Sequence, residues 1–213
     1  MSISDCPNFP NCGHKSESEC NFDSSGKKSN TMGLRLYSFC NFYISQIQGG
    51  IQTAHLVHEL FNKYGTVDNS KGFSQLDKWS RNHKTIIVLN GGPNEYLRSR
   101  WMMFQRELSA VEDEIKCKLP WSSFNEDEFS LGGVMTCVGV VLPECIFDAV
   151  DYKTAMNTLP DGKTFADVFA SQRNGSYFWL QENVEGDKYV SKHYKTGSAT
   201  SRLIADVKSC RLF

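Results

Sequence analysis

Apolar and polar positions follow two periods along this chain, and these periods predict its secondary structure. Apolar runs at residues 34–44 and 85–89 are typical of buried strands. The second run ends at Asn90-Gly91-Gly92-Pro93, a sequence that breaks regular structure. Shorter apolar stretches at 121–124 and 133–142 predict two more strands. We therefore expect a sheet of four strands.

Helical periodicity separates the first three of these strands. From 51 to 64 the apolar side chains fall in one broad arc, with Gln52 and His55 on the opposite side. Apolar residues repeat at helical spacings between 96 and 115, and a further helix is predicted for 144–156. The alternation predicts an α/β fold, a three-layer α/β/α sandwich around a mixed, mainly parallel four-stranded sheet.

Composition divides the chain into three parts. Residues 1–31 are rich in Ser, Asn, Cys, Pro and Gly and lack hydrophobic periodicity, which predicts a flexible segment. Residues 32–157 hold the predicted α/β domain. Residues 158–213 are expected to pack on that domain as an extension. Two strands and one helix are predicted within it, at 177–180, 188–190 and 199–212.

Charge and hydropathy limit the classes of partner. Hydrophobic residues make up 40% of the chain and charged residues 22%, as in globular proteins. The net charge of −1 provides no global attraction for nucleic acid, so any basic surface must be local. The chain has no apolar run of membrane-spanning length and no signal-peptide pattern, so we expect a cytoplasmic protein without a membrane partner. Cys40 and Cys137 lie in strand-like runs and are expected to be reduced and buried.

The first candidate site surrounds the glycine pair Gly49-Gly50, which we expect between a strand and a helix. Glycine there lets the backbone approach a ligand closely, and free N–H groups at the helix start attract anions. Gln48 and Gln52 could bind a ligand through amide donors and acceptors, or could be ordinary polar surface. His55 could contact the ligand or act as an acid or base, or could be a solvated surface histidine.

Two further candidates lie in predicted loops. Asn90, Gly91 and Gly92 end a strand, where α/β sheets commonly place ligands, although a tight strand-to-helix turn is the favoured explanation. Glu126 and Asp127 belong to an acidic loop at 125–128, which could be a metal or base site or a solvated charge run. Arginines in the helix at 96–115, Arg98 and Arg100 among them, could form a local phosphate-binding surface.

A metal site is the third candidate. Cys6, Cys12, His14 and Cys20 lie within fifteen residues with the spacing C-x5-C-x-H-x5-C. Three thiolates and one imidazole can complete a tetrahedral zinc shell. The alternative is a disordered tail. A structural zinc ion is the cofactor that this pattern indicates, and the expected chemistry elsewhere requires none.

Residues 34–156 resemble the type II peptidyl-tRNA hydrolase family. Gln52-Thr53-Ala54-His55 is similar to the Gln-Cys-Ser-His at the start of that family's first helix, and the strand at 84–89 with the helix at 96–115 follows in the family's order. Residues 135–143 resemble its late Gln-Thr-Val-Leu-Gly-Ile-Gly-Pro strand, with Thr136 at the position of the threonine. The resemblance implies this family's fold.

Two departures from the family change the expected chemistry. The family's lysine, four residues before the glutamine, falls on Gln48, and neutral glutamine cannot stabilise a developing negative charge as lysine does. The family's Asp-Ala-Gly-Arg-Thr loop, which carries a catalytic aspartate, falls near 125–129, where no Ala-Gly follows. Glu126 or Asp127 aligns with that aspartate only loosely.

Three functions remain as hypotheses, two of them based on the resemblance. The first is a binding protein that holds a nucleotide-like molecule or a tRNA end without turnover, such as a phage or bacterial accessory protein that sequesters a nucleotide signal. The second is a hydrolase of peptidyl-tRNA or a related ester, in which His55, Thr136 and Glu126 or Asp127 activate water. The third is a structural interaction protein with an N-terminal zinc ion and a homodimer interface on the sheet or its helices.

Overall fold

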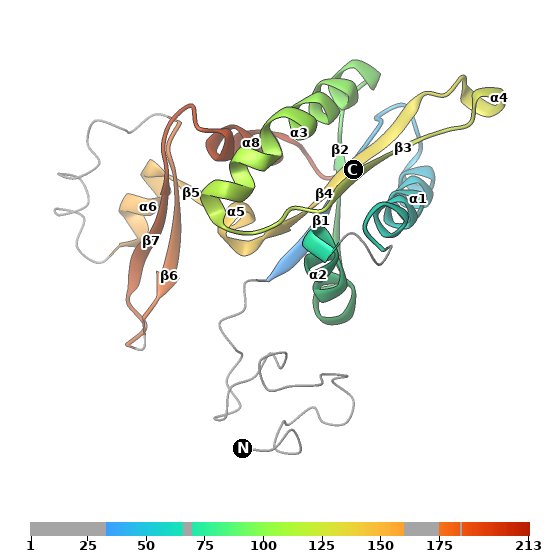
Figure 1. The fold of residues 1–213 in the computed structure, drawn as a ribbon. Coiled ribbons are helices and arrows are strands. Elements are labelled where there is room, and N and C mark those ends of the chain that lie inside the picture. Colours follow the sequence, from blue (N-terminus) through green and yellow to red (C-terminus); the bar gives the residue numbers. More distant parts are fainter. Residues whose placement is uncertain (1–32, 66–69, 160–174, 184) are drawn as a thin grey trace, which may run out of the picture. The chain divides into compact units, whose positions relative to one another are not determined.

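The main sheet has the strand order β2-β1-β4-β3 (Figure 1). In the computed structural model, which describes residues 33–65, 70–159, 175–183 and 185–213, all of these strands belong to one compact unit, Leu34–Phe213. β1 runs parallel to β2, and β4 runs antiparallel to β1 and to β3. The strands are β1 (Leu34–Cys40), β2 (Thr85–Asn90), β3 (Trp121–Asn125) and β4 (Met135–Pro143).

The α/β class and the mixed four-stranded sheet are confirmed, but the sheet is not mainly parallel. One of its three strand pairs is parallel. The reason lies in the connection between β3 and β4, which contains only the short helix α4 (Glu128–Leu131). A parallel pair needs a long crossover, whereas a short connection returns the chain antiparallel.

Helices cover both faces of this sheet. On one face, α1 (Gln46–Tyr64) and α2 (Ser70–Lys78) pack on inward side chains of β1 such as Leu36. On the other face lies α3 (Asn94–Ile115), whose Phe104 contacts Phe39 edge-to-face. The two faces of β1 are both buried because successive strand side chains point to opposite sides. A π-helix, η3 (Trp79–His83), continues α2.

Helix α1 begins five residues before the predicted start at Ile51, so Gly49 and Gly50 lie inside the helix and not ahead of it. Ser45 caps the helix: the Gln48 N–H donates to Ser45 Oγ at 3.3 Å, and the Ser45 N–H donates to Gln48 Oε1 at 2.9 Å. This capping box satisfies two backbone donors and offsets the low helix propensity of two glycines.

The buried face of α1 also differs from the predicted arc. Gln52 was placed on the polar side, yet it is 7% exposed, while Ile51 from the apolar arc is 50% exposed. The helix buries Gly49, Gln52, Thr53, Leu56 and Leu60. Burial of an amide is tolerated where it is hydrogen-bonded, and Gln52 has two partners on the sheet.

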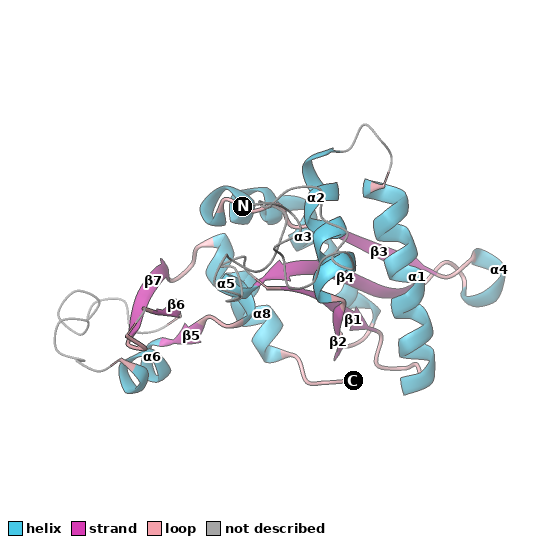
Figure 2. Ribbon diagram, turned by 90° about the horizontal axis from the view of Figure 1, so that it is seen from below, coloured by secondary structure: helices cyan, strands magenta, loops and turns pink. Residues whose placement is uncertain are grey.

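A second sheet follows, with the antiparallel order β5-β6-β7 (Figure 2). The helix predicted for 144–156 is divided into two, because strand β5 interrupts it. The two predicted strands at 177–180 and 188–190 are present and longer than expected. Lys192 of β7 joins this sheet to α3 by donating to the carbonyl of Ile115 at 3.1 Å. The elements are α5 (Glu144–Phe147), β5 (Val150–Asp151), α6 (Tyr152–Thr158), β6 (Tyr177–Glu182) and β7 (Lys188–Tyr194).

The final helix, α8 (Ala199–Ser209), ends three residues before the predicted 212. The following residues run along β2: Leu212 forms a bridge with Leu89, and the Phe213 N–H donates to the Val88 carbonyl at 3.1 Å. They cover the outer edge of β2. Within the described ranges, no helix combines the length and the apolar character that crossing a membrane requires.

Candidate functional site

The strand ends next to the start of α1 gather at one edge of the main sheet. The Asn41 N–H donates to the Thr136 carbonyl at 2.9 Å, and the Phe42 N–H donates to the Gly92 carbonyl at 3.1 Å. These bonds join the segments that follow β1 and β2 to the first residues of β4. We call this region the strand-end site and define it by Asn41, Gln52, Glu126 and Thr136.

A chain of hydrogen bonds through Gln52 forms the centre of the strand-end site. Gln52 Nε2 donates to Glu126 Oε1 at 2.6 Å, and Thr136 Oγ1 donates to Gln52 Oε1 at 3.0 Å. Because a carboxylate only accepts, the amide nitrogen must face Glu126. The fold thus brings together three of the predicted site residues, which lie 74 and 84 positions apart in the chain.

This chain of bonds leaves capacity for a ligand. Thr136 is 1% exposed, whereas Glu126 is only half buried. The amide of Gln52 has a second N–H, the carboxylate of Glu126 a second oxygen, and the Thr136 hydroxyl can still accept a bond. Glu126 is the partly exposed member, and the buried network fixes the position of its carboxylate.

In the described structure, Gln48 and Gly49 have structural roles. Gln48 is exposed, and its side chain completes the capping box of α1. Gly49 is buried against the Phe213 ring, because a Cβ at this position would lie 2.5 Å from a ring carbon. Gly50 faces open space. Their predicted contacts with a ligand remain predictions.

His55 lies on the exposed side of α1 and stacks on Phe124, with ring centroids 4.5 Å apart and an interplanar angle of 12°. Among the residues that the structure describes, it forms no hydrogen bond with Thr136 or Glu126. The Asp127 side chain bonds the backbone two residues further along the chain, since its Oδ1 accepts the Phe129 N–H at 2.8 Å. Of the two acidic candidates, Glu126 is the one bonded to Gln52.

Exposed aromatic rings border the strand-end site. Strand β1 ends at Cys40 and not at the predicted 44, because Asn41 Oδ1 accepts the Tyr43 N–H at 3.0 Å and turns the chain. The Phe42 and Tyr43 rings then contact each other in a tilted arrangement, with centroids 3.9 Å apart and an interplanar angle of 38°, and they are 43% and 76% exposed. The apolar pattern placed these two residues in a buried strand. Asn41, a turn-forming residue within that run, is the sequence signal that indicates their exposure.

Asn90, Gly91 and Gly92 lie at the end of β2, as predicted. Gly92 has a φ of +81°, which favours glycine, and Asn90 Oδ1 accepts its N–H at 3.0 Å. The Gly91 N–H donates to the Cys40 carbonyl at 2.7 Å. This geometry forms a tight turn directly beside Phe42.

A buried polar cluster lies behind Gln52. Ser38 Oγ lies 2.7 Å from Thr53 Oγ1 and 3.0 Å from Cys137 Sγ, and the sulfurs of Cys40 and Cys137 are 3.6 Å apart. A hydrogen bond from Cys137 lowers the pKa of the Cys40 thiol to about 7, while burial raises the pKa of Cys137 well above its usual range. Both cysteines are free and buried, as predicted.

The metal prediction falls on residues outside the described ranges. Cys6, Cys12, His14 and Cys20 all precede residue 33, where the description begins. Within the described ranges, no group of three or more His, Cys, Asp or Glu side chains could hold a metal ion.

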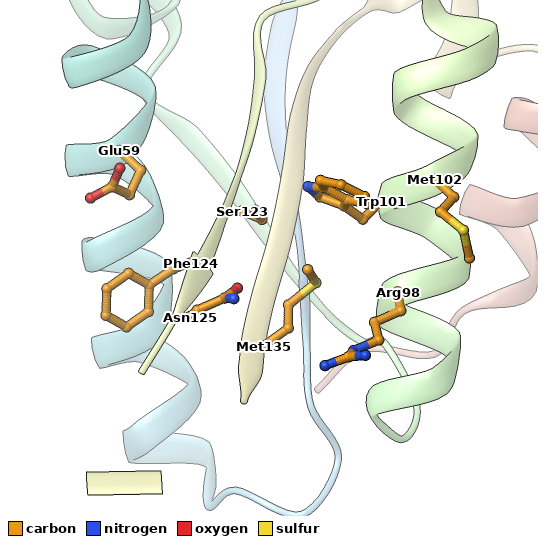
Figure 3. A pocket seen from close by; sticks show the side chains of 8 residues that line it. All are labelled: Glu59, Arg98, Trp101, Met102, Ser123, Phe124, Asn125 and Met135. Carbon is orange, nitrogen blue, oxygen red and sulfur yellow. The ribbon is translucent and has the colours of Figure 1, made fainter. Parts of the chain in front are cut away.

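An open groove of about 640 Å³ adjoins the strand-end site and extends along β3 (Figure 3). Helix α1 contributes Glu59, and α3 contributes Arg98, Trp101 and Met102. The strands contribute Ser123, Phe124, Asn125 and Met135. Asn125 and Met135 are the sequence neighbours of Glu126 and Thr136, so the groove lies close to the site along β3 and β4.

The predicted arginine surface is not formed as expected. Arg98 lines the groove, but Arg100 is 8% exposed and bonds Asp206 of α8 through both carboxylate oxygens, at 2.6 and 2.7 Å. Its guanidinium also lies 4.2 Å from the centre of the Phe39 ring. Arg100 therefore stabilises helix packing and is not available to a phosphate.

Comparison with protein-family models and with curated proteins gives no significant match for this chain. The functional argument therefore rests on the residues and their geometry.

Proposed function

We propose that this chain binds a nucleotide-like molecule or an RNA end at the strand-end site, without turning it over. The observation that carries the proposal is the buried hydrogen-bond chain from Thr136 through Gln52 to Glu126, next to the exposed rings of Phe42 and Tyr43. Amide and carboxylate groups can bond the donor and acceptor edge of a base. Exposed aromatic rings supply stacking surfaces for the face of a base.

The start of α1 carries a neutral glutamine in place of a cation, which favours binding over hydrolysis. Gln48 stands where the resembled family carries lysine, and its amide completes the helix cap. In the described structure His55 has no hydrogen bond to Thr136 or Glu126, so His55 is not coupled to the residues with which it would activate water. Arg98 is a cation within the adjoining groove that could contact a phosphate.

We also propose that the scaffold is a divergent relative of the type II peptidyl-tRNA hydrolases. Two residues that the resemblance singles out separately, Gln52 in α1 and Thr136 in β4, are joined by a hydrogen bond of 3.0 Å. The order of strands and helices through residue 143 also agrees with the order on which the resemblance rests.

The first test is mass spectrometry of small molecules released when the purified protein is denatured. Titration calorimetry with adenosine monophosphate and with a single-stranded RNA hexamer then compares variants. Thr136→Val and Tyr43→Ala should each weaken binding about tenfold, the effect of losing one hydrogen bond or stacking contact. Thr85→Val is the matched control, because Thr85 starts β2 at the opposite end of the sheet and should leave binding unchanged.

A protein that releases no nucleotide and binds neither probe contradicts the proposal. So does equal binding by the Thr136→Val and Thr85→Val variants when both are folded by circular dichroism.

A hydrolase is the second candidate, and the Glu126–Gln52 hydrogen bond favours it. A half-buried carboxylate in a fixed position could orient a water molecule beside Thr136. Cleavage of N-acetyl-aminoacyl-tRNA by the parent protein, lost in His55→Ala and in Glu126→Gln, would establish this function and replace the first. An inactive parent and a Gln48→Lys variant that gains cleavage would support the binding function.

A further inference from the structure

One edge of the main sheet, at β2, is paired at residues 88–90 with the last residues of the chain, and the other edge, at β3, is partly open. We propose that the groove along β3 binds an extended segment of a different protein chain, which adds to the sheet as a further strand. This inference does not depend on the nucleotide-like ligand, because it rests on backbone groups and charges of β3 and its flanking helices.

The edge at β2 already has a partner. The Asn90 N–H donates to the Arg211 carbonyl at 2.9 Å, and the Phe213 N–H donates to the Val88 carbonyl at 3.1 Å. An incoming strand cannot pair with residues 88–90 without displacing this segment. The β3 strand forms the opposite edge of the sheet.

Helix α1 covers the first residue of β3. The Trp121 N–H donates to the Tyr64 hydroxyl at 3.3 Å, and its carbonyl accepts bonds from Tyr64 at 3.4 Å and from Lys63 at 2.9 Å. The backbone groups of Trp121 therefore face away from β4. The Pro120 carbonyl faces β4, since it accepts the Val141 N–H at 2.8 Å.

Ser123 is the next residue whose backbone faces outward. In an antiparallel pair, backbone groups alternate between the partner strand and the outer side, so Ser123 repeats the orientation of Trp121. The register shift of β3 lies beyond it, between Phe124 and Asn125. No described side chain donates to or accepts from the Ser123 backbone, unlike that of Trp121. Its N–H and carbonyl can therefore pair with an added strand.

The groove supplies walls on both faces of such a strand. Figure 3 shows Glu59 of α1 on one side of β3, and Trp101 and Met102 of α3 on the other. Its volume of about 640 Å³ lies within the range that bound ligands occupy. An added strand would thus bury side chains between two helices and not on a bare sheet edge.

Charges on the two walls define the chemistry of the occupant. Glu59 and Arg98 form no ion pair with any described residue, and they lie on helices that cover opposite faces of the sheet. Side chains of an added strand alternate between these faces. The segment that fits carries basic residues toward Glu59, aliphatic residues toward Trp101 and Met102, and an acidic residue near Arg98.

The same charges argue against a second copy of this chain. The two-fold axis of an antiparallel strand pair is perpendicular to the sheet, so α1 of one copy would lie beside α1 of the other. Glu59 would then face Glu59, and Arg98 would face Arg98. Like charges across an interface are unfavourable, so a chain with the complementary pattern is the better occupant.

Fluorescence anisotropy with a labelled peptide tests the inference. The probe is an eight-residue peptide that alternates lysine and valine and ends in glutamate, and it is titrated with the full chain. Two matched peptides serve as controls, one with lysines and valines in separate blocks and one with alternate backbone nitrogens methylated. The alternating peptide should bind at least tenfold more tightly than either control.

Three variants locate the binding. Ser123→Pro removes the outward N–H, a position where an edge strand tolerates proline, and should abolish binding. Glu59→Lys should weaken binding about tenfold by reversing the charge of one wall. Glu185→Lys makes the same charge change in the exposed turn between β6 and β7 and should have no effect.

Equal binding of the alternating, block and methylated peptides overturns the inference, as does unchanged binding by Ser123→Pro. If Ser123→Pro does not fold, the methylated peptide and Glu59→Lys decide the question. A concentration-dependent dimer in sedimentation that Ser123→Pro abolishes would show that a second copy occupies the groove, and would also overturn it.

Discussion

Gln52 joins three elements of the fold through one side-chain amide. It projects from α1, accepts a bond from Thr136 of β4 and donates one to Glu126 after β3. Removing either partner would leave a buried polar group unsatisfied, which costs about 1–3 kcal/mol. The same bonds that stabilise this corner of the sheet therefore hold the groups with which a ligand would interact.

At the residue scale, adjacent glycines should respond in opposite directions to the same substitution. Gly50→Ala adds a methyl group in open space within a helix, so it should raise the free energy of unfolding by about 0.5–1 kcal/mol. Gly49→Ala places its Cβ 2.5 Å from a Phe213 ring carbon and must displace that ring. Urea unfolding should place Gly49→Ala about 1 kcal/mol or more below Gly50→Ala. An equal increase in the free energy of unfolding for both variants would contradict a steric effect of the Phe213 ring.

The sequence predicts single site residues better than their contacts. Gln52, Glu126 and Thr136 were all candidates, and the fold joins them. The exposure of Phe42 and Tyr43 was missed, because an aromatic pair next to a strand has the same apolar pattern whether it is buried or turned outward. The hydrogen bond from the Tyr43 N–H to Asn41 Oδ1 turns the chain so that the two rings face outward. Hydrophobic periodicity contains no information about this bond.

At the scale of elements, strands buried on both faces were the easiest to predict. β1 and β4 appear in the sequence as mainly apolar runs because both faces contact helices. The start of α1 was harder, since two glycines argue against a helix while Ser45 and Gln48 argue for one. The Ser-x-x-Gln spacing of a capping box was the signal that mattered.

One buried ion pair ties α8 to α3. Arg100→Met would leave Asp206 without its cation and should lower the free energy of unfolding by about 3 kcal/mol. In a double-mutant cycle with Asp206→Ala, we expect an interaction of more than about 1 kcal/mol, because Arg100 is 8% exposed.

The exposed pair Arg81–Asp77 provides the matched cycle. Its side chains are 65% and 33% exposed, so Arg81→Met and Asp77→Ala should interact by only about 0.3–0.5 kcal/mol. Equal interaction energies in the two cycles would contradict a structural role for burial at Arg100.

At the scale of the whole molecule, burial raises the pKa of several thiols and phenols. Cys117 reaches about 11, and Cys137, Cys145, Tyr37, Tyr64 and Tyr194 shift in the same direction. A free thiol in the unfolded chain loses its proton near pH 8.5, roughly two units before folded Cys117. The folded state then binds more protons than the unfolded state, so stability falls as the pH rises through this window.

Urea midpoints should therefore decrease between pH 8 and pH 10. Cys40 opposes this trend, because its pKa is lowered to about 7 and its contribution to stability grows above that pH. Lys63 and Lys78 oppose it as well, because burial lowers their pKa values. The thiols with raised pKa values, Cys117, Cys137 and Cys145, are expected to set the direction. Cys117→Ala should reduce the pH dependence by up to about 2 kcal/mol. A midpoint that is constant or rises over this range would contradict the expectation.

The pairing of β1 has a consequence for synthesis on the ribosome. Leu36 pairs with Ile86 on one side and with Val141 on the other, and the outer edge of β2 is paired at Val88 and Asn90 with the last residues of the chain, near Leu212. The nascent chain therefore carries β1 with one side unpaired until β4 has emerged, and β2 with a bare edge for longer still. Native pairing of this sheet is completed after most of the chain has been translated, which makes the protein a candidate for chaperone protection during synthesis.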